Sequence, residues 1–359
     1  MRIVAFLSDP DGQGHYRVLN PLTMLARLGH DVDVIRTRPK MTICASVFQG
    51  VDVVILQRLQ GIIDLLAPLK DHVPEEQLPK VVYDIDDNLW EMPHDNPSRI
   101  IDGPAVLTKL TQEMQRAHAV TVSTPELGHE IYRRGINRSI HLLPNGIDYD
   151  LRDWETIRER PLALRRRPII GWAGGLHHNG DEVPLGGTLA TVLRKHPEWL
   201  FVMQGSSELA GLWKRRLNIP EGQFYFLEGE DFNTYQTSIG RFDIAIAPLR
   251  VNDFNKCKSE LRLMEYGAQG VPYVASRIEP FTRFHHVTMG LGGFLASDEY
   301  EWRAQLEMLM QNYELRQTMS AAIRSQTRRH YDLAEIAPKY IAAFEAITGK
   351  RAERELAVR

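Results

Sequence analysis

Short apolar runs alternate along the first half of the chain with stretches whose apolar residues recur at helical spacing. The apolar runs predict strands at residues 2–7, 32–35, 51–57, 80–84, 119–123 and 140–143. The helical spacing predicts helices over residues 15–28, 104–117 and 125–134. Because strands that alternate with helices form a parallel, doubly wound sheet, this half is predicted to be a Rossmann-like α/β domain with its ligand site at the carboxyl ends of the strands.

The same alternation of predicted strands and helices resumes after a polar, charged stretch in which apolar residues do not recur at a regular spacing. Further strands are predicted near residues 167–174, 199–204, 224–227 and 242–247, and the chain is mostly helical after residue 298. We therefore predict a first domain over residues 1–150, a linker over 151–167, a second Rossmann-like domain over 168–332, and a helix over 333–359 that can pack back on the first domain. Two such domains predict a cleft between them.

Residues 242–276 are the most informative stretch, because they read as a strand, a basic loop, a helix and a second strand. The loop carries Lys256 and Lys258, and Ser259 is predicted to be the N-cap of a helix that stops near Gly270. A helix that begins at Ser259 would present its N–H groups and positive dipole end where the lysines also point. This arrangement is typical of a site for a phosphorylated ligand.

Arg262 and Glu265 follow Lys258 at spacings that place the three side chains on one face of this helix. A carboxylate one to two turns beyond a phosphate site can accept hydrogen bonds from a ribose. A solvated ion pair between Arg262 and Glu265 is the plainer alternative, and for an arbitrary helix it is the commoner one. The lysines, the preceding strand and the depth of the carboxylate favour the ligand site.

Composition and charge narrow the classes of function. The 359 residues are 43% hydrophobic and 25% charged, which excludes a mainly disordered chain. A net charge of -3 provides no bulk attraction to nucleic acid or to an anionic membrane. The two cysteines, Cys44 and Cys257, suggest neither a disulfide framework nor a CxxC metal site, and no apolar run is long enough to cross a bilayer. We therefore expect a cytoplasmic protein.

A glycine-containing loop follows the first predicted strand. Gly12 and Gly14 form only a fragment of a dinucleotide-binding fingerprint, because no third glycine follows at the required spacing. His15 and Arg17, at the start of the next helix, could reach into the cleft. A dinucleotide-dependent oxidoreductase, with a ribose-binding acid near Asp31 or Asp33, stays open as an alternative.

Three carboxylates, Asp84, Asp86 and Asp87, stand at the end of the fourth predicted strand and just beyond it. Carboxylates this close repel one another unless a cation, a basic group or solvent separates them. One of them could orient a substrate hydroxyl or act as a general base, or the group could bind a divalent cation. We favour the first role, with Asp86, Asp87 and the nearby His94 as candidate catalytic residues. The alternatives are that Asp84 caps a turn while the others are solvated, or that Asp84 and Asp86 belong to a phosphatase.

Several segments together resemble the nucleotide-sugar glycosyltransferases of the GT-B architecture, closest to the large retaining group with an E-x7-E motif (glycosyltransferase family four-like). The matching segments are GHYRVLNPL, VVYDIDDNLW, VSTPEL, LLPNGID, IIGWAGGLHHNGD and FNKCKSELRLMEYGAQGVPYVAS. The resemblance extends over most of the chain, and it is carried by the order and spacing of these segments. It implies an α/β fold of two Rossmann-like domains that face each other across a cleft, the first for the acceptor and the second for the donor, with a helical C-terminal segment.

The resemblance assigns donor-site roles only where positions match. Glu265 matches the second acid of E-x7-E, which implies contact with the donor ribose, whereas Cys257 stands at the first, sugar-contacting acid. The other implied donor-binding positions are Gly14, Gly174, Gly175, His178, Lys256, Lys258, Ser259 and Arg262. Relatives often carry Arg and Lys after the glycine turn at Gly174, where this chain has histidines and Asp181. The lysine-rich loop is therefore expected to carry most of the neutralising charge.

We therefore predict a hexosyltransferase-like enzyme that moves a sugar from a nucleotide-diphosphate donor, with UDP favoured, to an acceptor hydroxyl. The resemblance implies retention of configuration, no metal ion and no other cofactor. The expected acceptor is a glycan or a lipid-linked glycan. A modified DNA base is the alternative, as in viral enzymes of this architecture, and basic runs at residues 165–167 and 214–216 could then contact phosphates. A sugar-nucleotide sensor without turnover is a further alternative, and the oligomeric state is left open.

Overall fold

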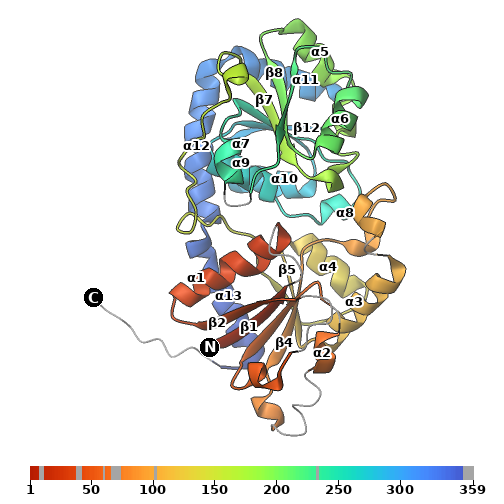
Figure 1. Cartoon of the computed structure of the whole chain (residues 1–359), viewed down its shortest axis with the longest axis vertical. Helices are drawn as coiled ribbons and strands as arrows, with labels where there is room; N and C mark the ends of the chain where they lie inside the picture. The colour runs from red at the N-terminus through yellow and green to blue at the C-terminus, as the bar shows by residue number, and fades with distance from the viewer. Residues whose placement is uncertain are drawn as a thin grey trace, which may run out of the picture. The chain divides into compact units, whose positions relative to one another are not determined.

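The computed structural model describes residues 1–7, 12–37, 43–59, 61–65, 74–100, 103–231 and 234–350. The chain divides into two compact units (Figure 1). The first comprises residues 1–87, 102–146 and 333–359, and the second comprises residues 88–101 and 147–332. Each unit is built on a six-stranded parallel sheet, so the predicted pair of Rossmann-like α/β halves is confirmed.

The sheet of the first unit has the strand order β2-β1-β3-β4-β5-β6. Its strands are β1 (Arg2–Leu7), β2 (Asp31–Arg36), β3 (Val53–Gln57), β4 (Lys80–Ile85), β5 (Ala119–Val122) and β6 (Ile140–Leu142). The chain moves outward from β1 to β2 and then crosses to β3 on the other side of β1. The winding direction therefore reverses between β1 and β3, which is where open α/β sheets bind their ligands.

The helices of the first unit are α1 (Asn20–Arg27), α2 (Ile62–Leu65), α3 (Pro104–Arg116), α4 (Pro125–Arg133) and α13 (Leu333–Thr348). Helix α13 packs with α1 in one hydrophobic core, where Leu22 and Phe344 are buried. The helix predicted to start at residue 15 opens instead as a π-helical turn, His15–Leu19. The spacing of apolar residues could not reveal this, because one wide turn barely shifts the period.

The sheet of the second unit has the strand order β12-β11-β10-β7-β8-β9. Its strands are β7 (Ile169–Gly174), β8 (Leu200–Gly205), β9 (Phe224–Glu228), β10 (Ile244–Ala247), β11 (Tyr273–Ser276) and β12 (Gly293–Ala296). Here the winding direction reverses between β7 and β10. This switch point lies between the predicted glycine turn, which follows β7, and the predicted basic segment, which follows β10.

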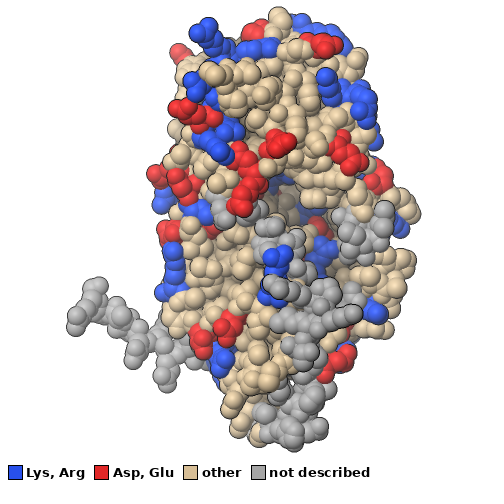
Figure 2. Space-filling view, in the orientation of Figure 1, with Lys and Arg blue, Asp and Glu red and all other residues tan. Residues whose placement is uncertain are grey.

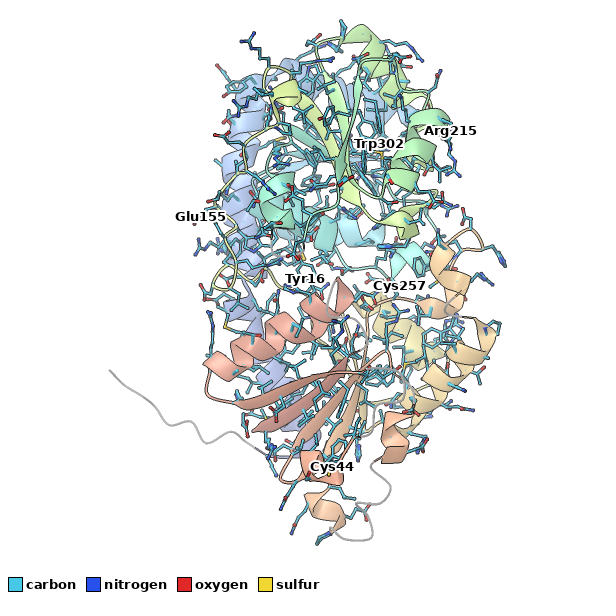
Figure 3. The ribbon with its side chains drawn as sticks, in the orientation of Figure 1. Tyr16, Cys44, Glu155, Arg215, Cys257 and Trp302 are labelled. Atoms are coloured by element: carbon cyan, nitrogen blue, oxygen red, sulfur yellow. The ribbon has the colours of Figure 1, made fainter. Side chains whose placement is uncertain are left out.

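Helices cover both faces of this second sheet (Figures 1 and 3). They are α5 (Thr188–Lys195), α6 (Ser207–Arg216), α7 (Tyr235–Ile239), α8 (Asp253–Lys256), α9 (Leu261–Ala268), α10 (Glu279–Val287), α11 (Glu299–Gln311) and α12 (Tyr313–Tyr331). Trp213 and Trp302 are fully buried in the core that α5, α6 and α11 form with one face. Tyr266 and Phe284 lie in the core that α9, α10 and α12 form with the other.

Two connecting segments pack on the second unit. Residues 151–167, the expected linker, bury Trp154 and Leu164 in its core, and Arg160 donates a hydrogen bond of 2.8 Å to Asp243. Residues 88–100, which begin three positions after the end of β4, also group with the second unit by their contacts. None of the helices described is both long and apolar enough to cross a membrane.

Candidate functional site

A glycine turn ends β7 at the switch point of the second unit. Gly174 closes the strand, and Gly175 precedes the 3-10 turn Leu176–His178. Gly205, at the end of the neighbouring β8, has a φ of 127°, and a Cβ there would lie 2.1 Å from the carbonyl oxygen of Gly174. The close approach of these two strand ends therefore requires glycine at position 205.

Arg262 extends from α9 to this turn. A Cβ added to Gly174 would lie 3.0 Å from Arg262 Nη2, and the guanidinium carbon lies 5.3 Å from the centroid of the Trp172 ring. Arg262 Nη1 is buried and has no hydrogen-bond partner among the described residues. Burial opposes the charge, but the neighbouring Tyr235 contributes to a raised pKa for Arg262, which stays a cation. A buried cationic N–H group without a partner is a candidate ligand for an anion.

Glu265 lies one turn beyond Arg262 on the same helix and is 6% exposed. Its Oε2 accepts a hydrogen bond of 3.3 Å from the hydroxyl of Tyr235 on α7. Burial, and after it the charge of Glu265, raises the pKa of Tyr235, so the hydroxyl stays protonated and donates this bond. The carboxylate is thus held in place one helical turn from the buried cation, at the depth predicted for a ribose ligand.

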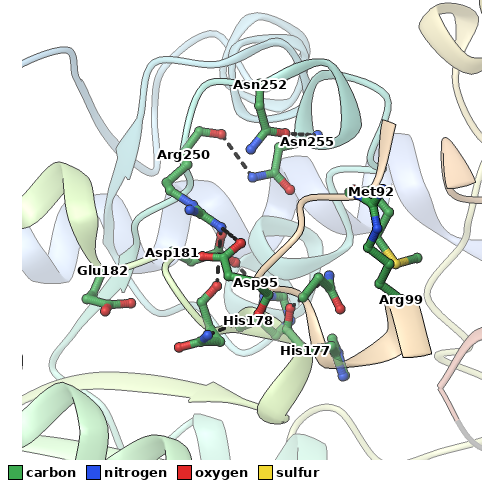
Figure 4. Close-up of polar contacts among 12 residues, drawn as sticks. Met92, Asp95, Arg99, His177, His178, Asp181, Glu182, Arg250, Asn252 and Asn255 are labelled. Atoms are coloured by element: carbon green, nitrogen blue, oxygen red, sulfur yellow. Dashed lines mark hydrogen bonds and ion pairs between the residues drawn. The ribbon is translucent and has the colours of Figure 1, made fainter. Parts of the chain in front are cut away.

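His178 is held between Asp181 and Arg262. Its Nδ1 lies 2.8 Å from Asp181 Oδ2, and its Nε2 lies 3.0 Å from Arg262 Nη2. Burial raises the pKa of Asp181 to about 7, and the charges of Lys258 and Arg250 oppose that rise. Figure 4 shows His178, Asp181 and Arg250 close together on the loops that follow β7 and β10. Both ring nitrogens of His178 are therefore already engaged by protein groups.

The start of α9 differs from its prediction. The short helix α8 lies where a loop was expected, because Asn252 caps it by accepting a hydrogen bond of 2.8 Å from the backbone of Asn255. Helix α9 begins only at residue 261, with Glu260 at its N-cap position, so Ser259 as N-cap is wrong. The side chain of Glu260 makes no cap hydrogen bond, and it accepts one of 3.0 Å from Arg283.

The two lysines of the predicted basic loop have different surroundings. Lys256 lies on α8 and pairs with Asp253 at 3.1 Å. Lys258 Nζ lies 4.4 Å from the centroid of the Phe254 ring. After burial, the charge of Lys258 is the strongest influence on the pKa of Asp181. Lys258 therefore lies close enough to Asp181 to influence its pKa, whereas Lys256 takes part in a local ion pair.

Cys257, at the position of the missing acid, is buried (labelled in Figure 3). Its Sγ lies 3.5 Å from Nδ2 of Asn88, which also donates a hydrogen bond of 3.3 Å to the carbonyl oxygen of Asp253. Asn88 is fully buried. A buried thiol in contact with an amide thus replaces the carboxylate that the resemblance associates with sugar contact.

Residues 88–101 make several polar contacts with the loops beside the switch point (Figure 4). Asp95 Oδ1 lies 2.9 Å from Arg250 Nη2, and the carbonyl oxygen of Asp95 accepts a hydrogen bond of 3.1 Å from Asn179. Asn96 donates one of 3.4 Å to the carbonyl oxygen of His177. No pattern in the sequence predicts these contacts, although Arg250, three residues after β10, could have been suspected from its place at a strand end.

In the first unit, Arg17, which the sequence suggested could reach into the cleft, is used inside the protein. Its side chain is fully buried and donates hydrogen bonds of 2.7 and 3.2 Å to the two carboxylate oxygens of Asp84. It also donates to the carbonyl oxygen of Leu143 and to Asn145. Asp84 accepts a further hydrogen bond of 2.7 Å from Thr121. Asp84 is therefore neither a cap nor a solvated group, because a buried cation neutralises it.

The glycine loop after β1 lies partly outside the described residues, which resume at residue 12. Gly12 has a φ of 50°, a conformation that favours glycine. Gly14 has a φ of -61°, within the helical region, and precedes the π-helical turn. The backbone conformation therefore accounts for glycine at position 12 but not at position 14. The implied role of Gly14 in donor binding stays a prediction.

Asp86 and Asp87 have different environments. Asp87 accepts a hydrogen bond of 2.8 Å from Gln13, which accepts one of 2.6 Å from Arg58. Asp86 Oδ1 is buried without a hydrogen-bond partner in the described part of the chain. Burial, and after it the charge of Asp87, raises the pKa of Asp86 to about 7. His94, the third predicted catalytic residue, is exposed and belongs to the second unit.

Sequence reasoning missed Gln13 and Arg58. They follow β1 and β3, which flank the first unit's switch point, and this position is the signal that could have found them. Arg58 has a φ of 52°, a strained conformation for a residue with a side chain. In the described ranges, no group of three or more His, Cys, Asp or Glu side chains is placed to hold a metal ion.

No protein-family model matches the chain. In sequence, it is 23% identical over 210 residues to TuaH of Bacillus subtilis (strain 168), which is provisionally assigned as a teichuronic acid biosynthesis glycosyltransferase. The aligned region covers 55% of this chain and 51% of TuaH, so the chain matches about half the length of this curated relative.

Two solved structures match over nearly the whole chain. Sucrose-phosphate synthase from Thermosynechococcus elongatus has a TM-score of 0.68 at 15% identity, with 97% of this chain and 100% of the other covered. HepE of Anabaena, in complex with UDP-glucose, has a TM-score of 0.65 at 15% identity, with coverages of 98% and 100%. At this identity the similarity establishes the fold, which is the GT-B fold that the sequence segments resemble.

Proposed function

We propose that the protein is a glycosyltransferase that binds a nucleotide-diphosphate sugar in its second unit and transfers the sugar to an acceptor hydroxyl. One observation carries this proposal: the buried Arg262, unpaired at Nη1, lies at the glycine turn of the β7/β10 switch point, and Glu265 follows one turn later on α9. The sequence similarity to TuaH favours glycosyl transfer, and the fold shared with HepE, which was solved with UDP-glucose, favours a UDP-sugar as the donor.

Each residue of this site has a role in the proposed transfer. Departure of the sugar leaves negative charge on the diphosphate, and the cations Arg262 and Lys258 stabilise that charge electrostatically. Glu265 accepts hydrogen bonds from the ribose. In the first unit, Asp86 orients the acceptor hydroxyl. We further propose, from the motif resemblance, that configuration is retained and that no metal ion is needed.

A glycan or lipid-linked glycan is the proposed acceptor. One arginine in each basic run that a DNA acceptor would use has partners within the protein: Arg167 donates to the carbonyl oxygens of Pro197 and Gly222, and Arg216 pairs with Glu182 at 2.7 Å. Figure 2 shows Lys and Arg interspersed with Asp and Glu over the described residues of the face in view. Mixed charge of this kind provides little attraction to a nucleic-acid backbone.

A panel of sugar nucleotides tests the donor class. A UDP-sugar at one hundred times its dissociation constant is expected to stabilise the protein by about 2.7 kcal/mol, because it binds the folded state alone. GDP- and dTDP-sugars at the same concentration should stabilise it less. Thermal unfolding followed by calorimetry or dye binding measures the shift.

Two variants test whether the shift in thermal unfolding comes from binding at the proposed donor site. Glu265→Ala and Lys258→Ala should lose most of the stabilisation by the donor, since each removes a group assigned to it. Lys195→Ala is the matched control, because Lys195 is exposed and pairs with Glu307 on α11. If no sugar nucleotide shifts the unfolding of the wild-type protein, the proposed function is wrong.

Asp86 provides a test on the acceptor side. Because its pKa is raised to about 7, its carboxylate form predominates only above that pH, and kcat/KM should fall as the pH is lowered from 8 to 6. Asp86→Asn should lower kcat for transfer by a factor on the order of 100 and remove this pH dependence. Transfer to a glycan acceptor found by screening measures both effects. Since the pKa of Asp181 is also about 7, Asp181→Asn is the control, and it should keep the acidic limb.

A further inference from the structure

The hydrogen bonds of His178 allow only one assignment of its protons. A guanidinium donates and never accepts, so His178 Nε2 must accept the 3.0 Å hydrogen bond from Arg262 Nη2. A neutral imidazole then carries its proton on Nδ1, which donates to Asp181 Oδ2 at 2.8 Å. Asp181 therefore fixes the tautomer that lets His178 hold Arg262.

The hydrogen bonds from Asp181 through His178 to Arg262 fix the orientation of the whole guanidinium group. The group is planar, so one bond at Nη2 together with the contact to the Trp172 ring sets the direction of its remaining N–H groups. Arg262 Nη1 is buried and has no partner among the residues described. Leaving a buried charged donor unpaired costs free energy, which a bound anion would recover. The arrangement thus places one cationic N–H donor, Arg262 Nη1, at the glycine turn, where an anion could accept its hydrogen bond.

We propose that Asp181 and His178 are positioning residues, which orient Arg262 so that its Nη1 donates to an oxygen of the donor diphosphate. This inference rests on the proposed function. It also changes the role of His178, which the sequence led us to expect in direct contact with the donor. Where relatives place cations after the glycine turn, this chain places a histidine and an acid that hold a cation from α9.

The charged groups around Asp181 are consistent with this role. Arg250 lies beyond β10, Lys258 beyond α8 and Arg262 on α9, while His177 and His178 lie on the same loop as Asp181. Burial raises the pKa of Asp181 to about 7, so both protonation states occur near neutral pH. Each state retains an oxygen that can accept the Nδ1 hydrogen bond of His178, and the orientation of Arg262 is kept in both.

A double-mutant cycle on the full chain tests whether Asp181 acts through Arg262. Titration calorimetry would give the affinity of whichever of UDP, GDP and dTDP binds the wild-type protein most tightly. Asp181→Leu should weaken binding about tenfold, because the imidazole loses the acceptor that orients it. Asp181→Asn keeps an acceptor oxygen and should stay within about threefold of wild type. In an Arg262→Met background, Asp181→Leu should have no further effect.

The possible results separate this inference from the proposed function. Absence of binding by the wild-type protein for all three nucleotides would overturn the proposed function and the inference with it. Binding by the wild type together with additive losses in the double variant would overturn the positioning role alone. Equal losses in Asp181→Asn and Asp181→Leu would overturn it as well. Thermal unfolding of each variant shows whether it is folded, and Asp181→Asn keeps the test valid if Asp181→Leu is not.

Discussion

Replacing Arg17 with methionine is expected to lower the free energy of unfolding of the first unit by about 3–5 kcal/mol. Arg17 is the buried cation that neutralises Asp84, and it also donates to the carbonyl oxygen of Leu143 and to Asn145. Methionine fills a similar volume but leaves the Asp84 carboxylate buried, with Thr121 as its one remaining side-chain donor among the residues that the structure describes. An uncompensated buried charge is among the most destabilising changes that a single substitution can make.

The measurement must follow the first unit by itself. All six tryptophans lie within residues 88–101 and 147–332, so their fluorescence reports on the second unit. Hydrogen exchange of peptides from β1 and β4, read by mass spectrometry, reports on the first. Exchange there should accelerate in Arg17→Met, while the fluorescence transition should move little.

Two further variants sharpen this test. The double variant Arg17→Met with Asp84→Leu removes both charges and should recover much of the lost stability. Arg133→Met is the matched control, since Arg133 forms an exposed ion pair with Glu130, and its loss should change stability by less than about 1 kcal/mol. Equal destabilisation by Arg17→Met and Arg133→Met would show that the buried pair is not what stabilises the unit.

The strands were largely predictable because their signal is local. Each interior strand is a short apolar run buried on both faces, and β1, β4, β7 and β10 lie within a residue or two of their predicted bounds. The strand β12 was missed, because Gly293–Ala296 begins with one glycine and directly follows another, and glycine is depleted in strands. Residues 88–101 could not be placed either, because Asp95 and Asn96 contact residues more than eighty positions away.

The position of the candidate site was predictable from the sequence, but the hydrogen bonds between its residues were not. The glycine turn, Arg262 and Glu265 were expected, because strand ends and helix spacing are visible in the sequence. The bond between His178 and Arg262 joins residues 84 positions apart, and no local pattern encodes it. For the same reason the sequence suggested that Arg17 could reach into the cleft, because its partner Asp84 lies 67 positions away.

Replacing Arg262 with methionine is expected to lower kcat/KM for the donor by a factor of about 100 to 1,000. Methionine can pack against Trp172, as the guanidinium does, but it has no N–H group for the diphosphate and no charge to stabilise its departure. The loss should appear in kcat as well as KM, because the negative charge that Arg262 stabilises grows toward the transition state. Release of the nucleoside diphosphate from the donor identified in the panel measures the rate.

Two matched variants decide whether this loss comes from the position of the cation. Arg262→Lys keeps a charge but loses the planar fork that His178 and Trp172 orient, so its rate should lie between those of Arg262→Met and wild type. Arg303→Met removes an arginine from the surface of α11, where it pairs with Glu307, and should leave the rate unchanged. A rate for Arg262→Met within threefold of wild type, in a variant that unfolds at the wild-type temperature, would remove Arg262 from the site. The diphosphate charge would then rest on Lys258, as the sequence first suggested.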